Sequence, residues 1–359
     1  MERLLTTLAS HRELCRGIEP HYALCFEGRL SAELMRAKAP VHWLGKVRIS
    51  HPLTVVRARR RLGELVQQHS FGLVICHSAW SHSLFAPTAR AANIPLAFWL
   101  HSATKGTHWL ERWARRTRPD LVLCNSKFTA KSLPKMYPDV RSEVIYCPVA
   151  TPADMNTAAD RAAKRAELQT PENAVVIIQV SRMESWKGQD LHLKALSLLK
   201  DLPGWVCWQV GGAQRPAELE YLKHLKGLAG RLGIGNRVHF LGQRSDVAGL
   251  LAAADVYCQP NTEPEPFGIS FIEALLAQLP VVSTNIGGAS EILKKSLGEL
   301  VPPGDPQALA GALRRLIEDR GLRAHLGANG PHRARELCDP TTQIEHLGRL
   351  LVSVAPLAA

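Results

Sequence analysis

Short apolar runs alternate with longer amphipathic segments along almost the whole chain. The strands expected in the first half lie at residues 21–28, 41–45, 71–80, 94–102, 120–126 and 142–149. Those expected in the second half lie at 174–183, 205–212, 237–243, 254–260 and 279–288. Nearly continuous apolar strands are buried on both faces, and helices between them, for example 187–200 and 217–233, make the sheets parallel. The pattern predicts an α/β protein with two doubly wound domains.

The expected domain boundary falls between residues 150 and 172, where prolines and small polar residues gather in CPVATPAD and QTPENA. The chain has 359 residues, which suits two domains of roughly 150 to 180 residues. We therefore expect an N-terminal domain over 1–150 and a C-terminal domain over 151–359. We allow the last helix to cross back to the N-terminal domain.

The hydropathy of the chain bears on its location. No apolar run reaches the roughly 18 to 20 residues that a membrane-spanning helix needs, and the N-terminus lacks the layout of a signal peptide. We therefore expect a cytoplasmic protein. The cysteines are scattered singly and mostly inside apolar runs, which predicts buried thiols rather than disulfides or a zinc site. They are residues 15, 25, 76, 124, 147, 207, 258 and 338.

The positive charge is concentrated in the first half. The formal net charge is +12, and residues 1–150 hold 22 Lys and Arg against 10 Asp and Glu, whereas residues 151–359 are balanced. Such asymmetry indicates an anionic partner for the first domain. Nucleic acid is the least supported partner because the chain lacks zinc-finger and RNA-binding signatures. Anionic lipid and phosphorylated acceptors remain.

Two basic segments, 57–65 and 109–118, are candidates for that contact. In the second segment, Trp109 and Trp113 share one helical face with arginines around it. Such a face suits a membrane interface, and it equally suits tryptophans packed on the core with a solvated basic back.

Chemistry is expected beyond the carboxyl ends of the parallel strands. After the strand 174–183, Arg182 and Lys187 stand five residues apart in a strand-to-helix loop. They could converge on a phosphate group with help from the next helix's free N–H groups, or they could be two solvated loop charges.

A second motif follows the strand 254–260. Glu265 and Glu273 bracket Pro-Phe-Gly and the start of an apolar segment. These two carboxylates could form a glycosidase-like pair, bind a metal or lie on an exposed helix face. The composition predicts a helix from about Gly268, which leaves Glu265 in the preceding loop and Glu273 in the second turn. The two carboxylates therefore cannot share one helical face, and the N–H groups of Phe267, Gly268 and Ile269 can bind an anion between them.

The sequence E-P-F-G-I-S-F-I-E over 265–273, preceded by V-S-R-M-E-S-W-K-G-Q-D and followed by G-G-A-S-E, resembles glycosyltransferase family 4. The match is strong over 174–304 and looser over 20–150. The resemblance implies the GT-B fold, in which two Rossmann-like domains face a central cleft. It also implies that Arg182 and Lys187 bind the diphosphate of a sugar donor.

The same resemblance assigns roles to the second motif. Glu265 would stand at the donor sugar, Glu273 would hold the ribose hydroxyls, and the amides of Phe267, Gly268 and Ile269 would contact sugar and phosphate. Two further assignments follow by position. Arg244 would line the nucleotide base. His101, at the end of the strand in 94–102, would face the donor sugar. A histidine at this position can also be a structural hydrogen-bonding residue.

The resemblance thus implies a retaining transferase that moves a sugar from a nucleotide diphosphate sugar to a hydroxyl of an acceptor glycan or glycolipid. The expected process is cell-envelope polysaccharide or glycolipid biosynthesis. The catalytic group would be His101, Arg182, Lys187 and Glu265. No metal or other cofactor is expected. Peripheral contact with the inner face of the cytoplasmic membrane would suit the basic first domain. A nucleotide-sugar epimerase of the same fold is the alternative enzyme.

One departure from the family pattern concerns the beginning of the chain. The opening MERLLTTLASH resembles the family's first helix, so the first strand and its glycine-rich loop are expected to be missing. An inactive or truncated glycosyltransferase-like binding protein is therefore a further alternative.

Overall fold

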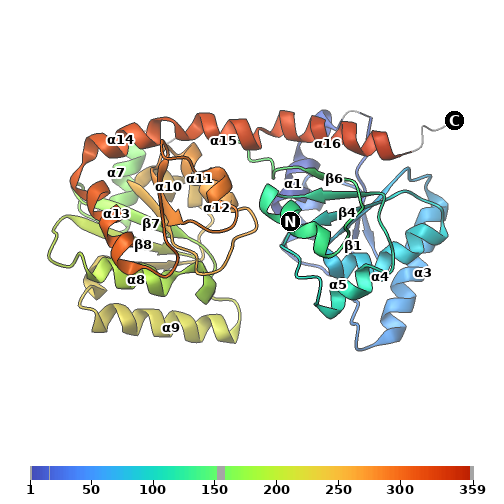
Figure 1. Ribbon diagram of the computed structural model, residues 1–359, viewed down its shortest axis with the longest axis horizontal. Helices are drawn as coiled ribbons and strands as arrows, with labels where there is room; N and C mark the ends of the chain where they lie inside the picture. Colours follow the sequence, from blue (N-terminus) through green and yellow to red (C-terminus); the bar gives the residue numbers. More distant parts are fainter. Residues whose placement is uncertain (1, 16, 152–157, 356–359) are drawn as a thin grey trace. The chain divides into compact units, whose positions relative to one another are not determined.

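The computed structural model describes residues 2–15, 17–151 and 158–355. It divides into two compact units, one formed by Met1–Val149 with Cys338–Ala359 and the other by Ala150–Leu337. Each unit is an α/β structure with parallel sheets (Figure 1), as the apolar runs predict.

The first unit carries two parallel sheets, β1-β2 and β3-β4-β5-β6. Its strands are β1 (Tyr22–Leu24), β2 (Val41–Trp43), β3 (Val74–His77), β4 (Leu96–Leu100), β5 (Leu121–Cys124) and β6 (Ser142–Val144). Its helices are α1 (Glu2–Ser10), η1 (Arg12–Leu14), α2 (Arg29–Arg36), α3 (Pro52–Gln68), α4 (Ser78–Ala91), α5 (Trp109–Ala114), α6 (Lys127–Ser132), η2 (Leu133–Lys135) and α16 (Pro340–Val354).

The second unit has one parallel sheet in the order β12-β11-β10-β7-β8-β9. Its strands are β7 (Val175–Val180), β8 (Trp205–Val210), β9 (Val238–Gly242), β10 (Val256–Gln259), β11 (Val281–Thr284) and β12 (Gly298–Val301). Its helices are α7 (Ala158–Glu167), η3 (Ser185–Lys187), α8 (Gln189–Ser197), α9 (Pro216–Arg231), η4 (Gly235–Arg237), α10 (Val247–Ala253), α11 (Ile269–Leu276), α12 (Ala289–Ile292), α13 (Pro306–Glu318), α14 (Arg320–Ala328) and α15 (Gly330–Cys338).

The order of strands in the second unit reverses between β7 and β10. Strands added after β7 run outward on one side as β8 and β9, and strands from β10 onward run outward on the other. In a doubly wound sheet the ligand crevice lies at this switch point, outside the carboxyl ends of the two central strands. We therefore expect a ligand site of this unit at the loops after β7 and β10.

Helices cover both faces of that sheet. On one face, α8 packs against α9 and α13, and α10 packs against α7 and α11 on the other (Figure 1). The burial of β7 matches this arrangement, because Val175 and Ile177 join the core beneath α8, α9 and α13, while Val176 and Ile178 are buried outside that cluster. Burial on both faces explains why β7 reads as a continuous apolar run.

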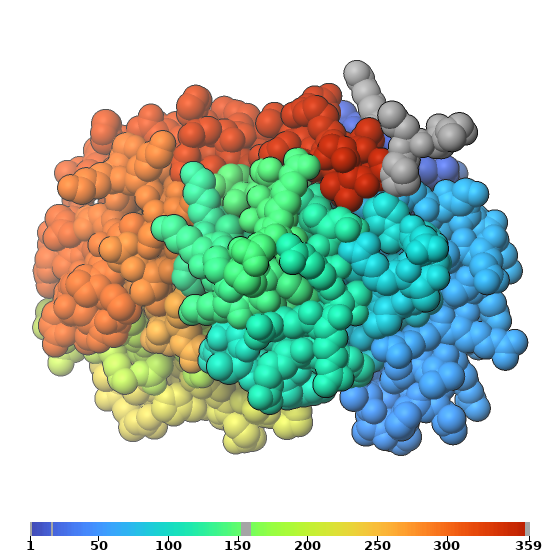
Figure 2. Space-filling view, turned by 45° about the vertical axis from the view of Figure 1, so that its right-hand side comes forward, coloured from blue at the N-terminus to red at the C-terminus, as the bar shows by residue number. Residues whose placement is uncertain are grey.

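The last helix belongs to the first unit by its contacts. The backbone N–H of Val149 donates to the carbonyl of Cys338 over 2.9 Å, and the N–H of Tyr146 donates to Oε1 of Gln343 over 3.1 Å. Figure 2 shows this red helix lying against the green and cyan segments of the first unit. The polypeptide therefore completes its first unit with its final residues.

Two sequence predictions, on the cysteines and on the tryptophans of α5, can be compared with the structure. All eight cysteines are free, and seven are buried, with Cys25 half-buried, which confirms the prediction of thiols within the core. On α5, Trp113 packs against the apolar core of the first unit, whereas the side chain of Trp109 is 49% exposed. Packing on the core is thus confirmed for Trp113, and the membrane contact of this helix stays a prediction. No described helix is both long and apolar enough to cross a membrane.

Candidate functional site

A buried ion pair lies at the carboxyl edge of the second unit's sheet. Nζ of Lys187, in η3 after β7, donates to Oε2 of Glu265, in the loop after β10. The two side chains are only 11% and 14% exposed. The ring of Trp186 lies 4.0 Å from the same Nζ, which adds a cation–π contact. The fold therefore joins two residues that sequence reasoning assigned separately to the diphosphate and the sugar.

Two glutamines at strand ends hold this pair. Nε2 of Gln259, the last residue of β10, lies 3.4 Å from Oε2 of Glu265 and donates to Oδ1 of Asn261 over 3.1 Å. Nε2 of Gln179, in β7, donates to the carbonyl of Lys187 over 2.8 Å. Sequence reasoning missed both residues. The available signal was an amide near the end of an otherwise apolar strand, where a buried polar group requires a partner.

A glycine lets the two loops approach each other. Gly188 follows Lys187 with a φ of +76°, and a Cβ at this position would lie 1.8 Å from the carbonyl oxygen of Pro260. The N–H of Thr262 also donates to the carbonyl of Trp186 over 2.8 Å. A side chain at residue 188 would separate the segments that carry Lys187 and Glu265.

The helix after Glu265 begins as the sequence predicts. Gly268 is the N-cap of α11, with a φ of +101°, and as a glycine it has no side chain to cap this terminus. The first N–H groups of a helix have no intrahelical acceptor, so those of Gly268 and Ile269 can bind an anion. Phe267 is buried, and Glu273 is half-buried in the second turn. The prediction that Glu265 and Glu273 cannot share a helical face is confirmed.

The two predicted arginines are both engaged with acids. Arg182, after β7, lies with Nη1 3.0 Å from Oε1 of Glu184, and its side chain is 61% exposed. Arg244, after β9, donates through Nη2 to Asp246 over 2.6 Å and to Glu167 over 2.7 Å. These hydrogen bonds raise the pKa of Arg244 and hold the pKa of the Asp246 carboxyl well below its usual range. Their roles as donor ligands stay predictions.

The predicted histidine lies in the first unit, at the carboxyl end of β4. Nε2 of His101 is 3.0 Å from Nδ1 of His77, the last residue of the adjacent strand β3, and the rings stack with centroids 5.3 Å apart. Nδ2 of Asn125 donates to the carbonyl of His101 over 3.3 Å. Sequence reasoning missed His77, although it too ends a buried strand.

Burial keeps both imidazoles neutral. Desolvation lowers the pKa of His101 to about 2, with a smaller contribution from His77, and desolvation lowers the pKa of His77 to about 3. Only one of the two facing nitrogens can then carry a proton, so the hydrogen bond fixes the tautomer of each ring relative to the other. His101 can offer one defined donor or acceptor to a ligand.

These lowered pKa values predict that folding stability is lost on acidification. Above the unfolded pKa of about 6.5, both states are neutral, whereas below it only the unfolded state takes up the protons. The unfolding free energy should therefore fall by about 1.4 kcal/mol per pH unit for each of the two histidines between about pH 6 and 4. Urea unfolding at a series of pH values measures the slope. His77→Asn should reduce this slope by about one histidine's share. A slope equal to that of the wild type would contradict the linkage.

A metal site is one of the alternatives for the carboxylates of the second motif. Within residues 2–15, 17–151 and 158–355, no group of three or more His, Cys, Asp or Glu side chains is arranged to hold a metal ion. Near the carboxyl ends of β7 and β10, Lys187, Arg182 and the first N–H groups of α11 can interact with an anionic ligand.

Two Rossmann-type units, the second with a cation, a carboxylate and a helix N-terminus at its switch point, define a protein of the GT-B class. Comparison with known families agrees. The family described as Glycosyltransferase Family 4 matches residues 1–151, and the family described as Glycosyl transferases group 1 matches residues 160–333. The chain belongs to glycosyltransferase family 4.

Individual relatives support this membership. The chain is 32% identical over 237 residues to D-inositol 3-phosphate glycosyltransferase of Salinispora tropica, covering 60% of this chain and 47% of the relative. It is 32% identical over 170 residues to the lipopolysaccharide core biosynthesis glycosyltransferase LpsE of Rhizobium meliloti, covering 47% of each. The chain thus spans about half the length of these curated relatives.

A solved structure matches over nearly the full length. The crystal structure of Anabaena HepE in complex with UDP and glucose superposes with a TM-score of 0.83 at 26% identity, covering 98% of this chain and 95% of HepE. The expected GT-B fold is therefore confirmed.

Proposed function

We propose that this protein transfers a sugar, with retention of configuration, from a nucleotide diphosphate sugar to a hydroxyl of a glycan or glycolipid acceptor. The observation that carries the proposal is the Lys187–Glu265 pair beside the open N-terminus of α11, at the carboxyl ends of β7 and β10. A diphosphate needs cations and N–H donors, and a sugar needs a hydrogen-bond acceptor. This edge of the sheet supplies all three.

Lys187, Arg182 and the first N–H groups of α11 would stabilise the negative charge that develops on the departing diphosphate. Because these groups are themselves cationic or carry N–H donors, we propose that the reaction requires no metal. Glu265 would accept hydrogen bonds from sugar hydroxyls, and Glu273 from the ribose. Arg244 would stand at the base, with Asp246 and Glu167 orienting its guanidinium.

The first unit would bind the acceptor. His101 would present one defined proton donor or acceptor to the donor sugar, because His77 occupies its Nε2. We propose a uridine nucleotide as the donor, since the HepE structure contains UDP and glucose. The LpsE relative, named for lipopolysaccharide core biosynthesis, supports an envelope glycolipid as acceptor and a cytoplasmic protein at the inner membrane face.

A donor screen tests the proposal. A panel of nucleotide sugars is added without metal and with a chelator, and the melting temperature is recorded for each. A donor at 100 times its dissociation constant should stabilise the unit that binds it by about 2.7 kcal/mol. The stabilising donor is then incubated with glycolipid acceptors, and the anomeric configuration of the product is read by NMR. Binding without transfer would favour a binding protein, and a converted donor sugar would favour an epimerase.

A further inference from the structure

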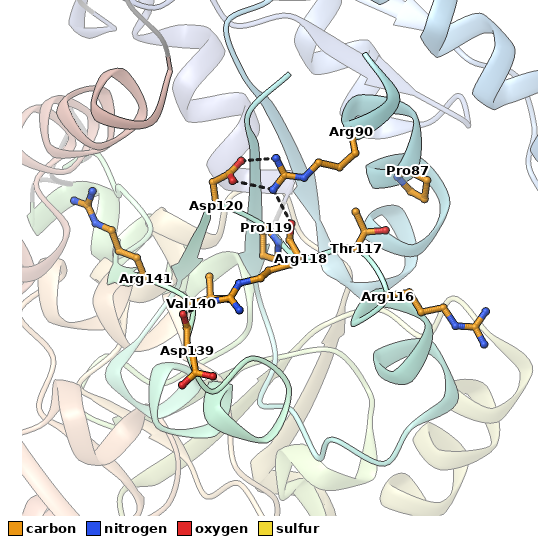
Figure 3. Close-up of a pocket in the computed structure, with 10 residues that line it drawn as sticks. All are labelled: Pro87, Arg90, Arg116, Thr117, Arg118, Pro119, Asp120, Asp139, Val140 and Arg141. Carbon is orange, nitrogen blue, oxygen red and sulfur yellow. Dashed lines mark hydrogen bonds and ion pairs between the residues drawn. The ribbon is translucent and has the colours of Figure 1, made fainter. Parts of the chain in front are cut away.

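A hollow of about 750 Å³ opens in the first unit (Figure 3). It is formed by three segments, namely the end of α4, the loop between α5 and β5, and the loop before β6. Its lining residues are Pro87, Arg90, Arg116, Thr117, Arg118, Pro119, Asp120, Asp139, Val140 and Arg141. Four of the ten side chains are arginines.

The hollow lies at the amino edge of the sheet. Asp120 and Arg141 directly precede β5 and β6, and Oδ2 of Asp120 accepts a hydrogen bond from the N–H of Leu96, the first residue of β4, over 2.8 Å. His77 ends β3 and His101 directly follows β4, at the opposite edge. The strands separate the hollow from the histidine pair, so it is a second site rather than part of the first.

One arginine of the hollow is already neutralised. The guanidinium of Arg90 contacts both carboxylate oxygens of Asp120, through Nη1 over 2.8 Å and Nη2 over 2.9 Å. The same Nη2 also donates to the carbonyl of Arg118 over 2.6 Å. These dashed contacts stand at the centre of Figure 3. The pair contributes no net charge and fixes the backbone that carries Arg118.

The other three guanidinium groups keep their charge. Arg118 donates to the backbone carbonyl of Asp139, which positions the guanidinium without neutralising it. The nearest carboxylate contact of Arg141 is with Glu143 at 3.8 Å, and its side chain is 51% exposed. Arg116 is exposed, and the described contacts give its side chain no partner.

The charge balance of the hollow is therefore positive. Arg116, Arg118 and Arg141 face a single remaining carboxylate in the lining, that of Asp139. Figure 3 shows Arg116 and Arg141 on opposite sides of Pro119 and Arg118, with their guanidinium groups pointing outward, so binding one ligand between them would require new rotamers of these exposed side chains. Clustered guanidinium groups repel one another, and an anion with several oxygens relieves that repulsion.

We propose that this hollow binds a phosphate group, carried either by a lipid headgroup or by a soluble phosphate. A guanidinium presents paired N–H donors that match two oxygens of one phosphate, which a point charge cannot do. The hollow accounts for part of the positive excess of residues 1–150. The site is independent of sugar transfer, because it uses none of the residues assigned to the donor.

The test compares two double variants that remove the same charge from the same unit. Arg116→Gln/Arg118→Gln changes the hollow, and Arg36→Gln/Arg48→Gln removes two exposed arginines that lie outside both basic segments. One probe is inorganic phosphate, titrated against chloride at matched ionic strength by calorimetry. The other is sedimentation with vesicles of phosphatidylcholine, alone or with about one lipid in five as phosphatidylglycerol. Arg116→Gln alone is measured too, because Arg118 has a structural hydrogen bond.

The hollow variant is expected to weaken binding of at least one probe about 10-fold, and the control variant less than about 2-fold. Weakened phosphate binding identifies a soluble phosphate as the ligand. Weakened sedimentation with phosphatidylglycerol vesicles alone identifies a lipid headgroup. The proposal is overturned if the full-length wild type binds neither probe, or if both double variants weaken binding equally, since the effect would then be general charge.

Discussion

Glu265→Gln is expected to reduce sugar transfer at least about 100-fold, the loss typical of removing one group that stabilises a transition state electrostatically. The substitution keeps the shape of the side chain but removes the negative charge opposite Lys187. Lys187 then remains nearly buried without a counter-charge, which should also lower the unfolding free energy by about 3 kcal/mol. Initial rates with a saturating donor and urea unfolding measure the two effects.

The double variant Lys187→Met/Glu265→Gln separates catalysis from folding. Removing both charges leaves no buried ion uncompensated, so stability should return to within about 1 kcal/mol of the wild type. The transfer rate of the double variant should stay as low as that of the less active single variant, Lys187→Met or Glu265→Gln. If stability and transfer returned together, the pair would be structural, and the proposed site would be wrong. If neither single variant lost transfer, the same conclusion would follow.

The Lys187–Glu265 pair also bears on how the proposed donor would bind. Lys187 donates to Glu265, and Gln259 supplies a second hydrogen-bond donor to the carboxylate. A diphosphate that takes Lys187 must replace the attraction of Glu265, and sugar hydroxyls can then compensate the carboxylate. Donor fragments that carry only one of these groups, such as UDP, would leave one charge without a new partner. We therefore interpret the pair as favouring a complete nucleotide sugar over its fragments.

Most of the fold could be predicted because its signal is local. Each expected strand contains an observed one. Strands such as β4, β5, β8, β10 and β11 are buried along their whole length and are therefore nearly continuous apolar runs, whereas β1, β2 and β6 are partly exposed. β12 was missed because Gly298 and Glu299 occupy half of its four residues. The return of α16 to the first unit was only allowed for, because its contacts with the segment around Tyr146 join residues about 200 positions apart, beyond the reach of any local pattern.

The candidate site was predictable to a smaller extent. Loop position and the helix start placed Glu265, Glu273 and Lys187 at one edge of a sheet, because parallel strands end together. The contact between Lys187 and Glu265 could not be foreseen, since it depends on β7 and β10 being neighbours in the sheet. The same reason hid the hydrogen bond between His77 and His101. Strand order, rather than strand identity, was the missing information.

The second large effect is expected at Gly287, in the turn between β11 and α12 that packs against the loop of Glu265. Gly287 has a φ of +62°, and a Cβ there would lie 2.4 Å from the carbonyl oxygen of Glu265 and 2.7 Å from its nitrogen. The next N–H, of Gly288, donates to that same carbonyl over 2.8 Å. Gly287→Ala must therefore displace the backbone of Glu265. Because misplacing a reacting group by about 1 Å can cost about 100-fold in rate, transfer should fall by at least that factor.

Gly304 provides the matched control for this substitution. Its φ is +77°, but a Cβ there meets nothing within 4 Å. Both alanine variants share the strain of a left-handed backbone, about 1 kcal/mol, and only Gly287→Ala adds the clash. Gly304→Ala should therefore lose about 1 kcal/mol of stability and keep its transfer rate, measured by urea unfolding and initial rates. If the two variants behaved alike, the loop around Glu265 would be free to relax, and Gly287 would have no part in positioning its carboxylate. Loss of transfer in Gly287→Ala alone would show that the turn behind the loop determines where the carboxylate of Glu265 stands.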